Sequence, residues 1–167
     1  MAVRVDLNGI KDRIQTTLVA ANTTTASPID LSSGMSQRVQ RVLKIHPGLI
    51  SPQASFFPLV TCYVTDKTID SEDIAGNQLN SRRKAKVMVN VVGVVWNQNF
   101  TADDEDPADE DINYLMENVE LVLRSDTDLG AKIKWQRSGS TEYYVNTINE
   151  QTHLRAGILK LEGTVFY

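Results

Sequence analysis

The chain has 167 residues, a length that can bury one substantial core and that is short for two domains. Hydrophobic residues make up 41% of it and charged residues 23%, a balance that argues against wholesale disorder and against a membrane protein. The net charge of -4 gives no general attraction to the phosphate backbone of nucleic acids. We therefore expect a single globular domain over residues 1–167, with no membrane partner and no specific nucleic-acid binding.

The only cysteine, Cys62, excludes an internal disulfide and is typical of a reducing cytosol. The first residues lack the apolar stretch of a secretory signal, and no run approaches the ~20 apolar residues of a membrane span. We therefore expect a protein that is cytosolic or released by lysis.

Apolar residues recur at steps of three and four over residues 6–21, which predicts an amphipathic helix. Threonines and a proline then end it, and residues 22–37 are polar and irregular, so we expect a surface loop there. A strand is expected over residues 38–46, followed by an irregular, proline-containing segment over residues 47–58. Alternation of apolar and mixed positions predicts a second strand over residues 59–65.

The polar stretch 66–81 leads into the longest strand signal, residues 87–96, which we expect to lie at the centre of a sheet. Apolar residues at helical spacing from 112 to 123 then predict a second helix. Asp106 suits the cap of this helix and Pro107 its first position, because proline is tolerated where the backbone N–H has no partner.

Alternation in the last third predicts a hairpin over residues 132–148, with its turn at Ser138-Gly139-Ser140, and a closing strand over residues 158–167. Hairpins in place of repeated β-α-β units predict an α+β fold, with a mainly antiparallel β-sheet and two helices packed on one face. The long loops of this single domain are expected near residues 22–37, 47–58 and 66–81.

Residues with catalytic or cofactor-binding chemistry do not gather at any spacing that such chemistry requires. The acidic run 103–111 could belong to a metal-binding loop, but a helix cap explains its position better. His46 and His153 have no partner at ligand spacing, and Cys62 falls on the apolar side of a strand. We therefore predict that the protein is not an enzyme and that it uses no catalytic residue, metal or cofactor.

Two features favour assembly with other protein subunits. Basic residues cluster at the entrance of the central strand and acidic residues precede the second helix, and unlike patches on one small subunit suit a head-to-tail ring. The central strand is also apolar on both sides, so its second side needs a cover: either the loop with Phe56 and Phe57, or another subunit. The candidate interface residues are Arg82, Arg83, Lys84, Lys86, Asp103, Asp104, Glu105, Asp106, Met88, Val92, Val94, Trp96, Phe56 and Phe57.

The layout resembles the tail terminator, or tail completion, proteins of long-tailed bacteriophages. The shared features are a leading helix, a strand, a long strand entered by basic residues, an acidic lead into the helix from Ile112 to Leu123, a hairpin and a closing strand. The closing strand reads Arg155-Ala156-Gly157-Ile158-Leu159-Lys160-Leu161-Glu162-Gly163-Thr164-Val165-Phe166-Tyr167. The resemblance spans most of the chain and is one of architecture, without a catalytic motif.

This resemblance implies a structural virion protein that forms a ring, commonly a homohexamer. The ring caps the finished tail tube, stops its elongation and offers an interface to the neck or connector. The implied partners are copies of the chain, tail tube subunits, sheath subunits if the tail is contractile, and neck proteins. The implied location is the tail-neck junction of the virion, after synthesis in the cytoplasm of the host bacterium.

Alternatives from the same structural class are another neck or head-tail connector adaptor and a tail tube subunit. Two further alternatives come from other classes. One is a small metal-dependent enzyme that uses the acidic residues and His153. The other is a nucleic-acid-binding module that stacks bases on aromatic residues near basic ones, namely Trp96, Trp135, Tyr143 and Tyr144.

Overall fold

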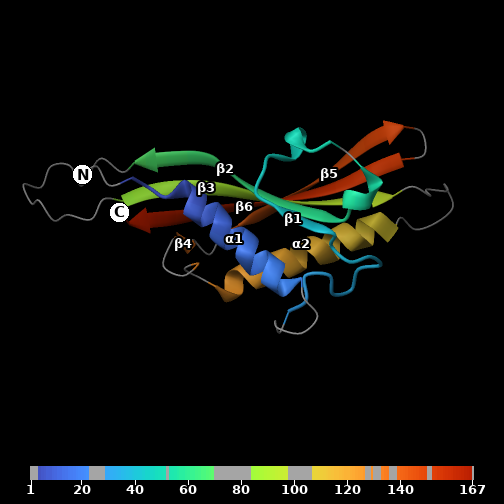
Figure 1. Ribbon diagram of the computed structural model, residues 1–167, viewed down its shortest axis with the longest axis horizontal. Coiled ribbons are helices and arrows are strands. Elements are labelled where there is room, and N and C mark those ends of the chain that lie inside the picture. The colour runs from blue at the N-terminus through green and yellow to red at the C-terminus, as the bar shows by residue number, and fades with distance from the viewer. Residues whose placement is uncertain are drawn as a thin grey trace, which may run out of the picture.

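The computed structural model describes residues 4–22, 29–51, 53–69, 84–97, 107–126, 129, 133–135, 139–149 and 152–166. Within these ranges the chain forms one six-stranded sheet and two α-helices (Figure 1). In chain order the elements are α1 (Leu7–Ala21), β1 (Arg41–Leu43), the short 3-10 turns η1 (Pro47–Leu49) and η2 (Ala54–Phe56), β2 (Leu59–Ile69), β3 (Lys84–Asn97), α2 (Pro107–Ser125), β4 (Lys134–Trp135), β5 (Ser140–Asn149) and β6 (Thr152–Phe166).

The strands lie in the order β1-β2-β3-β6-β4, and β5 also pairs with β6. Only β1 and β2 run parallel, and every other pair is antiparallel. β3 pairs along its whole length with β6, so these two strands form the centre of the sheet, as expected for β3. The predicted α+β class with a mainly antiparallel sheet is therefore confirmed.

Both helices pack against the same face of the sheet, which we call the helix face (Figure 1). Glycines allow α2 to approach the strands closely here: a Cβ at Gly157 would lie 2.4 Å from Cγ of Met116, and one at Gly93 would lie 2.8 Å from its sulfur. The main core consists of helix residues and one face of each strand. Its sheet side includes Val60, Cys62, Val87, Val89, Val91, Val95, Leu159 and Leu161.

The helices begin as the sequence predicts. The side chain of Asp6 caps α1 by accepting a hydrogen bond of 2.9 Å from the backbone N–H of Gly9. α2 begins at Pro107 and carries Asp109 and Glu110 in its first turn, where acids favour the positive end of the helix dipole. The proposed cap, Asp106, lies outside the described residues.

The predicted hairpin over residues 132–148 is wrong. β4 and β5 do not pair with each other, and both lie along the same edge of β6. The true hairpin joins β5 to β6, with Tyr143 opposite Gly157. Alternation in a sequence marks which segments are strands, but it does not identify their partners, and a two-residue β4 offers too few backbone groups to hold a hairpin by itself.

Two predicted boundaries also differ from the structure. β1 is only three residues long, whereas a strand was expected over residues 38–46. β2 continues to Ile69, so residues 66–69 are strand and not loop. Residues 65–69 are exposed on both faces and therefore lack the apolar alternation by which a strand is found in a sequence.

The described part of the predicted surface loop 22–37 is packed and partly buried. Leu31 is fully buried in the core, and polar side chains of α2 form hydrogen bonds with the segment. Asp111 accepts hydrogen bonds from the backbone N–H and the hydroxyl of Ser36, and the Asn118 amide donates to the carbonyls of Leu31 and Ser33. These contacts join segments about 80 residues apart, which local composition does not reveal.

The opposite face of the sheet, which we call the open face, is half covered by residues 47–58. Phe57 and Leu59 form a second apolar cluster there with Val92 and Val94, and the rings of Phe57 and Trp96 lie 5.2 Å apart. Two covers were expected for this side of β3, either the loop with Phe56 and Phe57 or another subunit, and in the structure the loop lies on it. In the part of the chain that the structure describes, neither helix is long and apolar enough to cross a membrane.

Candidate functional site

The predicted interface residues do not form one surface. Val92, Val94 and Phe57 are buried in the second cluster, while Phe56 and Trp96 pack against it partly exposed. This apolar group is thus closed by the chain itself and needs no other subunit to cover it. The remaining basic and acidic candidates, Arg82, Arg83, Asp103, Asp104, Glu105 and Asp106, lie outside the described residues.

The three other candidates lie together on the uncovered half of the open face. Lys84 and Lys86 are exposed at the start of β3, and Met88 follows with 37% of its surface accessible. Lys86 pairs with Glu162 at 3.6 Å, so only part of its charge is available to a partner.

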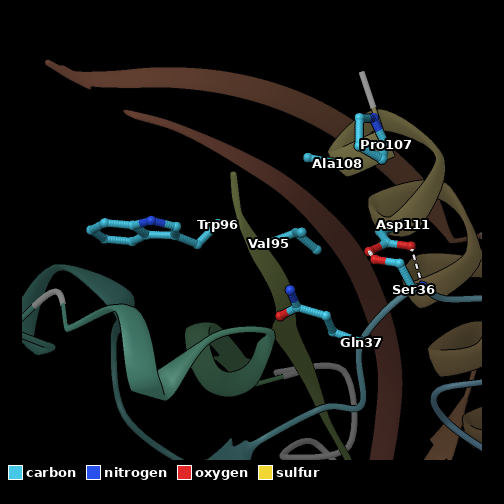
Figure 2. Close-up of a pocket in the computed structure, with 7 residues that line it drawn as sticks. All are labelled: Ser36, Gln37, Val95, Trp96, Pro107, Ala108 and Asp111. Carbon is cyan, nitrogen blue, oxygen red and sulfur yellow. Dashed lines mark hydrogen bonds between the residues drawn. The ribbon is translucent and has the colours of Figure 1, made fainter. Parts of the chain in front are cut away.

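A small pocket opens between α2 and β3, with a volume of about 80 Å³ (Figure 2). Its only carboxylate among the described residues is Asp111, and both oxygens of this group accept hydrogen bonds from Ser36, at 2.7 Å and 2.5 Å. Figure 2 shows Ser36 directly beside Asp111, with Gln37 and Trp96 further along the pocket. Because the carboxylate is fully engaged, we interpret it as a clamp that holds the 29–37 segment on α2.

A polar network occupies the open face beside the covered half. Lys160 donates to Glu142 at 2.5 Å, Tyr144 donates to the same carboxylate, and Asn90 donates to the Tyr63 hydroxyl at 3.3 Å. The hydrogen bond from Lys160, and then that from Tyr144, lowers the pKa of Glu142. The single acid of β5 is therefore already neutralised by its neighbour on β6.

On the helix face, three acidic residues of α2 line up beside β5. We call Asp109, Glu117 and Glu120 the acidic stripe. Partial burial raises the pKa of the Tyr143 hydroxyl, and so, to a smaller extent, do the negative charges of Glu117, Glu120 and Asp109. All three acids therefore lie near this ring on β5. Arg155 lies 3.8 Å from Asp109, and Arg124 pairs with Glu120, whereas Glu117 has no ion pair among the described residues.

A shallow hollow of about 250 Å³ lies along the exposed side of α2. Glu117, Glu120, Leu121 and Arg124 line it, and Leu121 is more than half exposed. The hollow therefore combines negative charge with apolar surface, a chemistry that suits a basic and partly apolar partner.

The outer edge of β5 is open. Among the described residues, β5 pairs only with β6, and Tyr143, Tyr144 and Val145 expose about half of their surface or more. Ten residues without lysine or proline form this strand, and its single register shift lies at its far end, between Thr147 and Asn149, so the stretch from Ser140 to Thr147 is open to pairing. We call it the β5 edge.

The other edge of the sheet, formed by β1 and β2, is paired along one part and unpaired along another. β1 pairs with β2 only from Leu59 to Thr61, and the amide of Gln15 donates to the Val42 carbonyl of β1 at 2.8 Å. Beyond this, no described strand pairs with the outer side of residues 65–69, which we call the β2 tip. The β2 tip and the far end of β5 lie at opposite ends of the sheet in Figure 1.

The alternatives from other classes find little support in the geometry. Tyr143 and Tyr144 point to opposite faces of the sheet, and Trp135 packs against the main core, so the four aromatic residues form no common stacking surface. In the described ranges, no three His, Cys, Asp or Glu side chains come together as metal ligands. Cys62 is buried, and burial raises the pKa of its thiol to about 11, which opposes thiolate chemistry.

Sequence reasoning did not assign the open edges to an interface: Val145 on β5, Lys67 and Ile69 on the β2 tip, and Glu117 beside the β5 edge were not candidates, and Tyr143 was one only for base stacking. One signal was present for β5: six of its ten residues are β-branched or aromatic and only one is charged. Compared with models of protein families and with curated proteins, the sequence gives no significant match.

Proposed function

We propose that the chain is a structural subunit that assembles with copies of itself into a closed ring and acts as a tail terminator of a long-tailed bacteriophage. In this role the ring caps the tail tube, stops its elongation and meets the neck or connector on its other side. The observation that carries the proposal is the pair of sheet edges that are open among the described residues, on opposite sides of a sheet whose two described α-helices lie on one face. A subunit with two different open edges has what a head-to-tail ring requires.

Three features of the surface support a binding role over a catalytic one. The described pocket near Asp111 is small, and its carboxylate is engaged. Many of the exposed apolar side chains lie on strands and on the outer side of α2, namely Ile69, Met88, Tyr143, Tyr144, Val145, Phe166, Tyr114 and Leu121, where a neighbouring protein reaches them. The uncovered half of the open face, with Met88 and its polar neighbours, is the surface that we assign to the tube or the neck.

Electron microscopy of the purified chain, alone and with tubes assembled from the tail tube protein of the same genome, tests this function. We expect rings of uniform size and, in the mixture, a ring at a tube end together with tubes that stop growing. Extension of the tubes by the chain itself would instead identify a tail tube subunit. A chain that neither forms rings nor binds tube ends contradicts the proposal.

A further inference from the structure

We infer that copies of this chain join head to tail through their sheets, with the β5 edge of one copy pairing antiparallel with the β2 tip of the next. The occupant of the β5 edge is thus a second copy of the chain. This inference rests on the proposed self-assembly and names the two surfaces that carry it.

The strand directions permit this pairing. β2 is antiparallel to β3, β3 to β6, and β6 to β5, so β5 runs opposite to β2 within one subunit. A second copy placed beside the first, with its helices on the same side, brings its β2 antiparallel to the β5 edge. The alternation of strand directions then continues from copy to copy without interruption.

The side chains on the helix face are complementary. Lys67 lies opposite Val87, and Ile69 lies opposite Ala85, so both belong to the helix face. Ile69 is 50% exposed, as is Tyr143 on β5, and pairs of aromatic and β-branched residues stabilise neighbouring strands.

The charges on this face are complementary as well. Lys67 is exposed and has no ion pair among the described residues, and the same holds for Glu117 beside the β5 edge. The α2 helix carries five acidic residues and one basic residue, Arg124, so its surface attracts a lysine from a neighbour. On the open face, Glu142 is already paired with Lys160, so it does not repel Asp66 of the next copy strongly.

The two edges are offset along the strands, so the strands of joined copies are inclined to the ring axis. Tyr143 of β5 lies level with Gly157 of β6, whereas Ile69, on the same face of the sheet, lies level with Val165 through Ala85. Pairing Ile69 with Tyr143 shifts each copy by eight residues, or about 26 Å, along the strands, while four strands span about 19 Å across the sheet. In a closed ring the strands would therefore be inclined by about 54° to the ring axis, somewhat more than the roughly 35–45° of closed β-barrels.

Charge reversal at the two edges tests the inference. Lys67→Glu alters the β2 tip and Glu117→Lys alters the neighbour of the β5 edge. Either variant alone is expected to raise the concentration needed for assembly at least about tenfold, because like charges then face each other. The double variant, and an equal mixture of the two single variants, are expected to assemble within about threefold of the wild type, because both restore opposite charges at every contact.

Lys44→Glu is the matched control, since it makes the same charge change at an exposed lysine that lies outside both the β2 tip and the β5 edge; it is expected to assemble like the wild type. Circular dichroism checks that each variant is folded, and hydrogen exchange should show that the outward-facing backbone amides of β5, which do not bond to β6, are protected only in the assembly. Rings that form normally with Lys67→Glu overturn the inference and leave the proposed function intact. Two-fold pairing through β5 alone would instead give dimers that are insensitive to Lys67→Glu and weakened only by Glu117→Lys, and it would overturn the inference as well. A wild-type chain that remains monomeric overturns both.

Discussion

Asp111 is a buried residue of α2 that holds the segment of residues 29–37 against this helix. It is 5% exposed and receives both the backbone N–H and the hydroxyl of Ser36, so removal of its carboxylate leaves two donors without a partner. We predict that Asp111→Ala lowers the free energy of unfolding by about 1–3 kcal/mol, measured by urea denaturation. Glu110→Ala, at the exposed neighbouring position of the same helix, should change it by less than about 0.5 kcal/mol. Equal effects of the two substitutions would refute the clamp.

Cys62 gives the second prediction at this scale. Burial raises the pKa of its thiol from 9.0 to about 11, so the folded state favours the protonated form. A raised pKa contributes stability that is complete below the unfolded value and is lost as pH rises through the folded value. The stability of the wild type relative to Cys62→Ala should therefore decrease between pH 9 and pH 11. A difference in unfolding free energy that stays constant over this range would show that the thiol does not ionise on unfolding.

At the scale of elements, the segment 47–58 acts as a cover for one half of the open face. Phe57 is 7% exposed and packs on Trp96, whereas Phe56 is partly exposed, with the Arg41 guanidinium 3.8 Å above its ring. We predict that Phe57→Ala costs about 3 kcal/mol of unfolding free energy and that Phe56→Ala costs about 1 kcal/mol. Thermal or urea denaturation of the two variants measures this. A larger loss of unfolding free energy for Phe56→Ala would mean that the exposed contact of Phe56 with Arg41, and not the burial of Phe57, holds this segment on the sheet.

The elements also show which parts of the fold local patterns predict. The helices follow from periodicity and capping residues, because α1 and α2 each bury one regular face. The central strand follows from its long apolar run, which the structure buries on both faces from Val91 to Val95. The partner of β5 could not be predicted, since hydrogen-bond pairing depends on the backbone and leaves no trace in side-chain type. The β2 tip was missed for a related reason: Lys67 and Thr68 are exposed on both faces, so nothing in their sequence distinguishes them from a loop.

The sequence predicted the kind of site, an interface between unlike charged surfaces, but not the residues that form it. Assembly through unlike surfaces was expected from basic and acidic clusters, yet the complementary residues among the described ones are Lys67 on β2 and Glu117 on α2. Neither stands out in the sequence, because each is a single charge in an ordinary polar context. Only the three-dimensional fold brings Glu117 next to the β5 edge, through the contact of α2 with β5 and β6.

For the whole molecule, the central feature is an asymmetric sheet. One face holds both helices, the other is half covered, and each side carries an open stretch of backbone of different length and chemistry. A heterologous contact between such edges generates a ring if the rotation closes and a filament if it does not. A closed ring is what a protein needs if it is to end a tube.

Native mass spectrometry over a range of concentrations tests this claim most directly, because it counts the subunits in each species. A closed ring predicts two dominant species, the monomer and one oligomer of fixed copy number, with the fraction of oligomer rising with concentration and no larger species beyond it. A chain that stays monomeric at every concentration, or an open series of ever longer oligomers, would contradict the account.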